Sequence, residues 1–199
     1  MQTSDSIVII PTYNEKENIE NIIRAVFGLE KTFHILVIED NSPDGTADIV
    51  RRLQNEFPER LFMIERKGKL GLGTAYITGF KWSIEKGYDY IFEMDADFSH
   101  NPNDLPRLYK ACHEEGADVS IGSRYVSGVN VVNWPMGRVL MSYFASKYVR
   151  FITGLPIHDT TAGFVCYRRK VLETIHLDHI RFKGYAFQIE MKFTAFKCG

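Results

Sequence analysis

The sequence has few cysteines, almost no net charge and no long apolar run, and each of these scarcities excludes a class of protein. Three cysteines among 199 residues, at positions 112, 166 and 198, are too few and too widely spaced for a disulfide framework or a zinc site. A formal net charge of −1 leaves no basic footprint for nucleic acid. No apolar run approaches the roughly 20 residues of a membrane span, and the start, MQTSDSIVII, is not a signal peptide.

The chain also lacks internal divisions. No Pro/Gly/Ser-rich linker, low-complexity tract or repeat interrupts residues 1–199, so we expect one α/β domain. The last stretch, GYAFQIEMKFTAFKCG, is typical of a helix without a stop signal. We therefore expect the chain to be a C-terminally truncated part of a longer protein.

Aliphatic segments alternate with helical ones along the sequence. Strands are expected at 6–14, 34–42, 60–66, 89–97 and 118–125, and helices at 15–27, 47–56, 67–86 and 100–116. Asn14 is expected to cap the first helix, with Glu17 at the capping-box position. This alternation implies βαβ units and a mainly parallel central sheet with helices on both faces.

Polar residues follow three of the expected strands at the point where each ends. The ligand crevice of such a sheet lies beyond the carboxyl ends of its strands. We therefore expect these residues to gather at one edge and to form a ligand site. They are Tyr13 and Glu15, Asp40 and Asn41, and Asp95 and Asp97.

The stretch YIFEMDADFSH ends a buried strand on two aspartates, Asp95 and Asp97. In an extended chain, residues i and i+2 point to the same side, so the two carboxylates should project together. Two close carboxylates repel each other unless a cation or a shared proton intervenes. We expect both to bind Mg²⁺ or Mn²⁺, whose remaining ligands are phosphate oxygens. The alternative is that one aspartate caps the following turn while the other is solvated.

The glycine-rich stretch after the third strand does not match the known phosphate-binding motifs. GLGTAY lacks the third glycine of G-x-G-x-x-G, and KGKLGLGT lacks the order of a P-loop. A dinucleotide-dependent dehydrogenase is therefore disfavoured. Lys67 and Lys69 in this stretch are expected near the ligand.

Six motifs taken together resemble glycosyltransferase family 2, most of all its dolichol- and polyprenol-phosphate mannosyltransferases. The resemblance runs through essentially the whole chain, and it implies a GT-A fold. It also implies an inverting transfer of mannose from GDP-mannose to a polyprenyl phosphate, with Mg²⁺ or Mn²⁺. The motifs are PTYNEKENI, VIEDNSPDGTADIV, GKLGLGTAYITGF, DADFSHNP, GADVSIGSRY and TTAGFVCYRR.

The same resemblance implies roles for individual residues. The donor nucleoside would be held by Pro11, Tyr13, Glu15, Ile38 and Asp40. The diphosphate and its metal would meet Asp95, Ala96 and Asp97, and the reaction would use Asp97, Arg124 and Arg138. Arg124 would reach the donor and Arg138 a phosphate. Acceptor-side residues would be Asp159, Thr161, Gln188 and Glu190. The chain departs from the family at Ser99, where relatives often carry a metal-binding Gln.

Residues 138–152 form a helical pattern with an unusually wide apolar arc. Arg138, Ser142, Ser146 and Arg150 fall at intervals of four, and the rest of the surface is apolar. Ordinary core packing is one explanation of this arc. Contact with a membrane surface or a lipid acceptor is the other. The second explanation, or a membrane-associated region beyond residue 199, would place the protein at the cytoplasmic face of a membrane.

Two other functions remain open on the sequence. A polyprenyl-phosphate transferase that uses UDP-glucose or another UDP-sugar fits the same motifs. A non-catalytic nucleotide-binding subunit of a larger assembly fits them as well.

Overall fold

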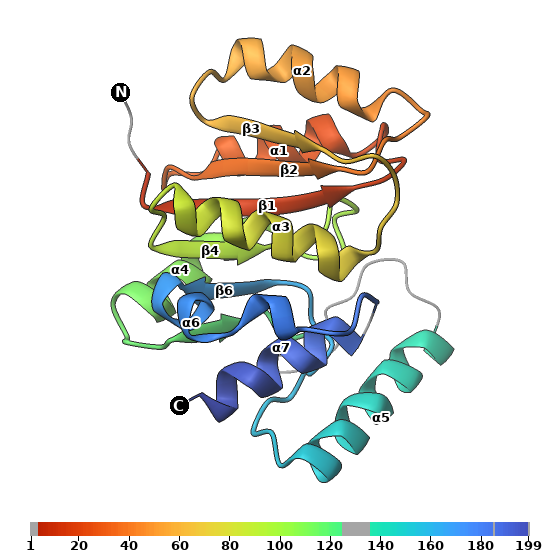
Figure 1. Cartoon of the computed structure of the whole chain (residues 1–199), viewed down its shortest axis with the longest axis vertical. Helices are drawn as coiled ribbons and strands as arrows, with labels where there is room; N and C mark the ends of the chain where they lie inside the picture. Colours follow the sequence, from red (N-terminus) through yellow and green to blue (C-terminus); the bar gives the residue numbers. More distant parts are fainter. Residues whose placement is uncertain (1–3, 125–135, 185, 199) are drawn as a thin grey trace.

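The computed structural model describes residues 4–124, 136–184 and 186–198. In this part of the chain, six strands form one sheet in the order β3-β2-β1-β4-β6-β5 (Figure 1). Strands β1 to β4 are mutually parallel, and β6 runs antiparallel to both of its neighbours. The strands are β1 (Ser6–Thr12), β2 (His34–Glu39), β3 (Leu61–Glu65), β4 (Tyr90–Glu93), β5 (Val119–Ile121) and β6 (Val165–Arg168).

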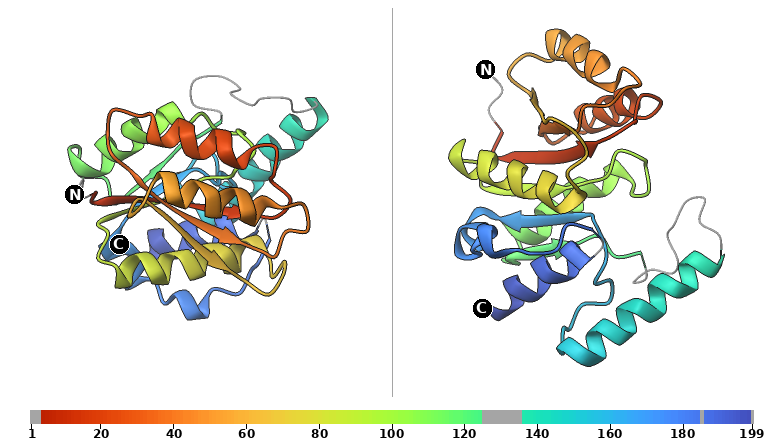
Figure 2. Two further views of the ribbon diagram at one scale, coloured as in Figure 1. Left: turned by 90° about the horizontal axis from the view of Figure 1, so that it is seen from above. Right: turned by 45° about the vertical axis from the view of Figure 1, so that its right-hand side comes forward.

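Helices cover both faces of the sheet, as the aliphatic strands require. Alternate residues of β1 enter opposite cores. Val8 and Ile10 pack with α1 (Ile19–Phe27), α2 (Thr46–Glu56) and α4 (Leu105–His113). Ile7 and Ile9 pack with α3 (Leu72–Glu85), α6 (Arg169–Thr174) and α7 (Ala186–Lys197). The view from above separates α1 and α4 from α3 and α6 across the sheet (Figure 2). The predicted α/β fold with a mainly parallel sheet is confirmed.

One further helix, α5 (Met136–Thr153), stands beside this layered body instead of lying on the sheet (Figures 1 and 2). Two short 3₁₀ helices complete the described elements, at Pro102–Asp104 and Leu177–His179. No helix within the described ranges is long and apolar enough to cross a membrane.

Several predicted element boundaries were wrong, and the errors lie at strand ends. The first helix begins at Ile19, not at Glu15, and Asn14 does not cap it. Instead, Asn14 has a left-handed backbone (φ 60°), and its N–H donates to Ser42 Oγ. The strand expected over 89–97 ends at Glu93, and the one expected over 118–125 covers only Val119–Ile121. At the first helix, the loop backbone bonds to the loop after β2, so the helix begins later in the chain.

Candidate active site

The carboxyl ends of β1, β2, β3 and β4 meet at one edge of the sheet, on the right in Figure 1. Because all four strands are parallel, their end loops lie side by side. Three non-glycine residues of the described chain with positive φ lie in the loops after these ends: Asn14, Asn41 and Phe98, with φ of 60°, 56° and 56°. Such backbone outliers cluster at functional sites. The predicted gathering of polar strand ends at one edge is therefore confirmed.

The loops after β1 and β2 are joined by three hydrogen bonds from backbone N–H groups to side-chain oxygens. These bonds fix the segment that carries Tyr13 and Glu15 against the segment that follows Asp40. The donors and acceptors are Asn14 N to Ser42 Oγ (3.1 Å), Glu15 N to Thr46 Oγ1 (3.1 Å) and Lys16 N to Asp44 Oδ2 (3.0 Å).

Asp40, a predicted nucleoside ligand, is bound by a residue that the sequence did not single out. Arg66 Nε donates to Asp40 Oδ1 (2.5 Å) and Arg66 Nη2 to Asp40 Oδ2 (2.7 Å), with both side chains 8% exposed. Arg66 Nη1 also donates to Thr74 Oγ1 (2.8 Å) in α3. Arg66 follows β3 directly, so the rule that polar strand ends form the site would have found it.

Three other residues predicted to bind the nucleoside differ in how far they are exposed. Pro11 and Ile38 are partners across β1 and β2, and Ile38 is fully buried. Tyr13 is 36% exposed, and Lys69 Nζ lies 4.6 Å from the centre of its ring. A partly exposed aromatic ring with a cation over it suits a flat, anionic ligand such as a nucleotide.

Asp95 and Asp97 lie just beyond β4 in different surroundings. Asp95 is half-buried and accepts a hydrogen bond from Tyr76 Oη (3.1 Å). Asp97 is exposed, and its Oδ1 accepts from the N–H of Ser99 (3.0 Å), so it also caps the turn. Burial and the negative charge of Asp97 raise the pKa of the Asp95 carboxyl to about 6. Ala96 between them is buried in the core.

Charges from other loops also act on Asp95. The negative charge of Glu15 raises the pKa of Asp95 further, and the positive charge of Arg124 lowers it. The segment that precedes β6 also approaches Asp95 closely, because a Cβ on Gly163 would lie 3.3 Å from Asp95 Oδ2. Asp95 is therefore the point where the loops of β1, β4, β5 and β6 converge.

The aspartate pair has the chemistry of a hard-cation site. Both residues offer carboxylate oxygens, and the exposure of Asp97 leaves it open to an ion from solvent. Among the residues that the structure describes, no group of three or more His, Cys, Asp or Glu could hold a metal ion. A cation on Asp95 and Asp97 would therefore take its other ligands from a bound molecule or from water.

Arg124, Asp159 and Thr161 form one buried cluster, although we assigned them to donor and acceptor sides. Arg124 Nε donates to Asp159 Oδ2 (2.7 Å) and Nη2 donates to Asp159 Oδ1 (2.6 Å) and Thr161 Oγ1 (2.7 Å). Asp159 is fully buried and Arg124 is 7% exposed. Burial alone raises the pKa of Asp159, but the hydrogen bonds and charge of Arg124 outweigh it and lower that pKa. The pair is ionised and fixes the Arg124 charge near Asp95.

A second polar cluster lies under the aspartate pair and contains Gln188, which we expected on the acceptor side. Lys192 Nζ donates to Ala162 O (2.7 Å) and to Gln188 Oε1 (3.0 Å), and both side chains are buried. Glu93 is fully buried beside them, and in the described part of the chain neither of its oxygens has a hydrogen-bond partner. Burial raises the pKa of Glu93 and lowers that of Lys192, and the charge of each partner opposes the shift of the other. Of this cluster, only Gln188 was singled out in the sequence, because Glu93 and Lys192 lie within apolar strand and helix patterns without a motif.

Glu190, the other predicted acceptor-side residue of α7, binds backbone. Its carboxylate accepts from the N–H groups of Arg181 (2.9 Å) and Phe182 (2.9 Å). The loop held in this way meets the start of α3, where Gly73 N donates to Lys183 O (2.9 Å). Glu190 thus holds the backbone of this loop in place. Arg138 belongs to α5, but its side chain lies outside the described residues.

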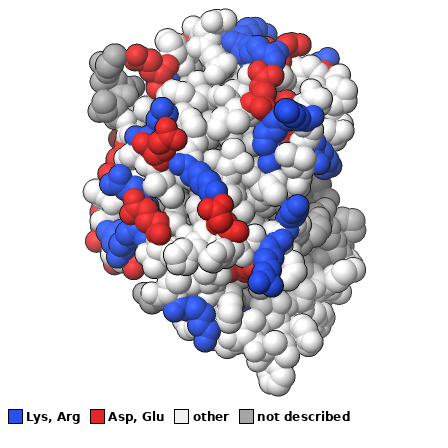
Figure 3. Space-filling view, in the orientation of Figure 1, with Lys and Arg blue, Asp and Glu red and all other residues white. Residues whose placement is uncertain are grey.

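Cations are frequent along this edge of the molecule. On the face shown in Figure 3, Lys and Arg side chains predominate in the right-hand part, toward the strand ends, with a few acidic side chains among them. The left-hand part carries interleaved acidic and basic side chains. The loops at the strand-end edge include exposed Lys67, Lys69, Arg181 and Lys183. This charge distribution favours the approach of an anionic ligand.

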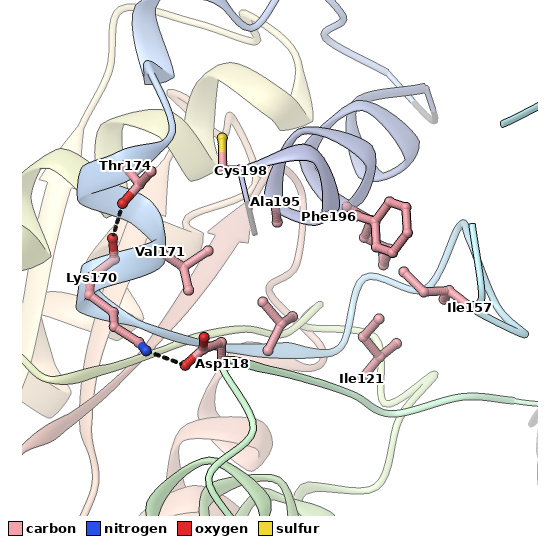
Figure 4. Close-up of a pocket in the computed structure, with 11 residues that line it drawn as sticks. Asp118, Ile121, Ile157, Lys170, Val171, Thr174, Ala195, Phe196 and Cys198 are labelled. Carbon is pink, nitrogen blue, oxygen red and sulfur yellow. Dashed lines mark hydrogen bonds and ion pairs between the residues drawn. The ribbon is translucent and has the colours of Figure 1, made fainter. Parts of the chain in front are cut away.

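A cavity of about 420 Å³ lies elsewhere, between β5, α6 and α7 (Figure 4). Its lining is mainly apolar, with Ile121, Val171 and Phe196 among the residues, and a Lys170–Asp118 ion pair (2.6 Å) lies at one side. None of the predicted site residues lines it. We therefore place the site at the strand ends, where the titratable groups and their perturbed pKa values converge.

A mainly parallel sheet whose strand ends present two aspartates, a buried arginine and a partly exposed tyrosine is typical of glycosyltransferases with a GT-A fold. The chain belongs to glycosyl transferase family 2, whose sequence model matches residues 7–176. The predicted family and fold are confirmed by these findings.

Two relatives illustrate the similarity in sequence. The chain is 47% identical over 197 residues to a polyprenol monophosphomannose synthase of Mycolicibacterium smegmatis, covering 99% of the chain and 74% of the relative. It is 40% identical over 184 residues to a dolichol-phosphate mannosyltransferase of Pyrococcus furiosus, covering 88% of the chain and 49% of the relative.

Solved structures with the same fold are more distant in sequence. A mannosyltransferase from Pyrobaculum calidifontis in complex with GDP-Man and Mn²⁺ superposes with a TM-score of 0.58 at 19% identity, over 86% of this chain and 47% of the other. A glucosyl-3-phosphoglycerate synthase from Mycobacterium tuberculosis with UDP superposes with a TM-score of 0.59 at 18% identity, over 92% and 62%. The chain spans about half the length of the first of these structures.

Proposed function

We propose that this chain carries the catalytic domain of an inverting mannosyltransferase that uses GDP-mannose and a polyprenyl phosphate. The observation that carries the proposal is the convergence of Glu15, Asp97 and Arg124 on Asp95 at the strand ends. The names of the relatives support mannose and a polyprenyl-type acceptor. The GDP-Man and Mn²⁺ in the Pyrobaculum structure support the donor and the cation.

In the proposed reaction, an oxygen of the acceptor phosphate forms a bond to the anomeric carbon of mannose. The bond from that carbon to the donor diphosphate breaks, and its electron pair leaves with GDP. The acceptor is already an anion at neutral pH, so the site needs no strong general base. This requirement agrees with a site whose residues compensate charge and place the reactants.

Different residues of the site would contribute to different parts of this reaction. Asp95 and Asp97 would hold Mg²⁺ or Mn²⁺, which when bound stabilises charge on the departing diphosphate. Arg124, held by Asp159 and Thr161, supplies a fixed positive charge near Asp95. Tyr13 offers its open ring to the base, and Asp40, oriented by Arg66, offers its free lone pairs to the nucleoside. Arg138 stays a predicted phosphate ligand.

The proposed acceptor is a lipid, so we place the protein at the cytoplasmic face of a membrane, as a peripheral protein.

Two rival functions use the same site. A transferase that uses a UDP-sugar is favoured by the UDP-bound structure of the same fold. A non-catalytic subunit would bind a nucleotide without transferring sugar.

Calorimetric titration of GDP and UDP, with and without Mn²⁺, tests the donor site. The wild type should bind GDP more tightly than UDP, and the binding should depend on Mn²⁺. Asp97→Ala should lose the metal dependence, because it removes the exposed half of the carboxylate pair. Asp48→Ala, which removes an exposed carboxylate on α2, is the matched control and should bind as the wild type does.

Each other outcome has a defined meaning. Tighter binding of UDP would overturn the mannose assignment. Metal-independent GDP binding that survives Asp97→Ala would make the aspartates structural. Nucleotide binding without transfer of labelled mannose to a polyprenyl phosphate would favour the non-catalytic subunit.

A further inference from the structure

Lys192 of α7 is a buried ammonium to which the proposed reaction gives no role. Its side chain is 2% exposed, although lysine is among the residues least often found inside a protein. Its neighbours on the same helix, Phe187 and Met191, are fully buried in an apolar core. An apolar side chain of similar length, such as that of methionine, would fill the same space without the cost of taking a charge out of water. The charge at position 192 therefore needs an explanation other than the filling of the core.

The ammonium of Lys192 has three protons, and each of them has an acceptor. Nζ donates to the carbonyl oxygen of Ala162 (2.7 Å), to Oε1 of Gln188 (3.0 Å) and to the main-chain oxygen of Gln188 (3.3 Å). The two acceptors on Gln188 belong to α7 itself, one turn earlier along the helix. The bond to Ala162 crosses to another segment, the loop that leads into β6.

Buried acids compensate the charge of Lys192. Burial lowers the pKa of this ammonium, and the negative charges of Glu93 and Asp159 oppose that shift. Glu93 belongs to β4 and is fully buried, and Asp159 is the ion-pair partner of Arg124. Charge as well as hydrogen bonding therefore holds Lys192 in place, and its position is coupled to that of the Arg124–Asp159 pair.

The loop residue after Ala162 is Gly163, which lies against the carboxylate of Asp95. A Cβ on Gly163 would come within 3.3 Å of Asp95 Oδ2 and within 3.8 Å of Gln188 Nε2. Because Oε1 of Gln188 accepts from Lys192, the orientation of this amide is fixed. The backbone of Gly163 therefore lies between Asp95 and Gln188.

Other bonds hold the same loop at its two ends. Before Gly163, the side chain of Asp159 is bound in its ion pair, and after it the carbonyl of Phe164 accepts from the N–H of Gly122 (2.8 Å). Neither of these bonds involves α7. The bond from Lys192 holds the middle of the loop, so its loss should release the backbone at Gly163 while both ends stay in place.

We propose that Lys192 is a positioning residue for the cation site at Asp95. Its hydrogen bond to Ala162 fixes the loop behind Asp95 and so fixes the direction in which this carboxylate faces. The proposal rests on the proposed function in one respect, because it is there that Asp95 binds Mg²⁺ or Mn²⁺. Groups that orient a metal ligand from outside typically change metal affinity by about 10–100-fold when they are removed.

Variants of two neighbouring α7 residues test the proposal. Lys192→Met removes the bond to Ala162, and Met191→Ala removes a buried apolar side chain, so both should lower stability in urea unfolding. Calorimetric titration of GDP in the presence of Mn²⁺ should show binding about tenfold weaker or more in Lys192→Met. Met191→Ala is the matched control and should bind GDP as the wild type does.

A double variant separates the positioning role from the stability of the fold. Glu93→Met/Lys192→Met replaces both buried charges by apolar side chains of similar length, an exchange that is often neutral for stability. The double variant still lacks the bond to Ala162, so its affinity for GDP with Mn²⁺ should also be about tenfold lower than that of the wild type. Hydrogen exchange of peptides that cover residues 159–165 should be faster in both Lys192 variants and unchanged in Met191→Ala.

The other outcomes identify what has failed. Wild-type affinity in the double variant, or equal losses of affinity in Lys192→Met and Met191→Ala, would overturn the proposal and make Lys192 a purely structural residue. Unchanged exchange of residues 159–165 in both Lys192 variants would overturn the anchoring of the loop, whatever the protein binds. Wild-type protein that binds no GDP in the presence of Mn²⁺ would overturn the proposed function, a result that is independent of every variant.

Discussion

Two arginine side chains of the site, Arg66 and Arg124, are held in ion pairs with Asp40 and Asp159, which come from other segments of the chain. Asp159 has no exposure and accepts three hydrogen bonds from Arg124, one from its backbone N–H and two from its guanidinium. A charge taken out of water costs several kcal/mol unless a partner and hydrogen bonds compensate it. Removing one member of this buried ion pair should therefore cost much more stability than removing one member of an exposed ion pair.

Asp159→Ala should lower the free energy of unfolding by about 3–5 kcal/mol, because it leaves the buried Arg124 charge without its partner. Urea unfolding monitored by circular dichroism would measure the loss. Asp89→Ala breaks the exposed Arg169–Asp89 pair (2.7 Å) and should cost less than about 1 kcal/mol. Equal losses in the two variants would show that Arg124 is well solvated without Asp159.

His100 provides a second test at the level of single residues. Its ring stacks on Phe164, with centres 5.0 Å apart and planes at 20°. Burial, followed by the positive charge of Arg124, lowers the pKa of His100 from 6.5 to about 4. The folded protein thus keeps this ring neutral at a pH where the unfolded chain protonates it. The stability that results is lost as the pH falls from about 6.5 toward 4.

His100→Phe should keep the stack and remove this pH dependence. Relative to the wild type, the variant should gain stability as the pH falls from 6.5 to 4, by up to about 3 kcal/mol. Urea unfolding at several pH values between 7 and 4 measures the difference. Parallel stability curves for the two proteins would mean that His100 titrates alike when folded and unfolded.

At the level of elements, glycines decide how closely α3 lies on the sheet. A Cβ on Gly79 would come within 2.7 Å of Ile9 Cγ2 in β1. A Cβ on Gly73 would come within 2.8 Å of the Phe182 carbonyl and 2.7 Å of the Phe187 ring. Tyr76, on the same helix, reaches Asp95 only at this close approach. The glycine-rich stretch therefore serves packing, as well as the tight turn before the helix.

Gly79→Ala should destabilise the protein by about 1–3 kcal/mol, since the added methyl group overpacks the contact with Ile9. Gly137→Ala on α5 is the matched control, because a Cβ there meets nothing within 4 Å. It should be neutral or stabilise the helix by up to about 1 kcal/mol. Thermal unfolding of both variants measures the contrast, and a Gly79→Ala protein as stable as the control would contradict the packing argument.

At the level of the whole molecule, burial is distributed unevenly. Every residue of β2 is buried, and β1 is buried except at Pro11, whereas α5 is exposed along most of its length. Local stability follows the number of buried apolar contacts that an element makes. The protein therefore combines a rigid sheet that positions the site with a helix that is held loosely beside it.

Hydrogen exchange should resolve this difference. Amides of β1 and β2 should exchange only by global unfolding, and those of α5 should exchange through local opening that costs several kcal/mol less. The amides of α1, a helix packed in the core, provide the internal comparison. Mass spectrometry of exchanged peptides measures both. Protection of α5 equal to that of α1 would show that α5 is part of the core body.

The sequence by itself determined the fold and the location of the site. Long aliphatic runs such as residues 34–39 must be covered on both faces, which requires helices on both sides of a parallel sheet. In a parallel sheet, the polar residues that follow the strands lie at one edge, and this can be predicted without knowing any tertiary contact. For this reason Tyr13, Asp40 and Asp95 could be grouped from their positions after strands alone.

Only the tertiary structure decided which side chains pair at that edge. Asp40 and Arg66 are 26 residues apart, and Arg124 and Asp159 are 35 apart, so no local periodicity relates them. The amide of Asn14 donates to Ser42 in the next loop, so α1 begins at Ile19 and not at Glu15 as predicted. The outward orientation of the apolar arc of α5 was likewise decided by the tertiary structure. A helical pattern gives the width of an apolar arc, whereas the contacts of the folded chain decide which way that arc faces.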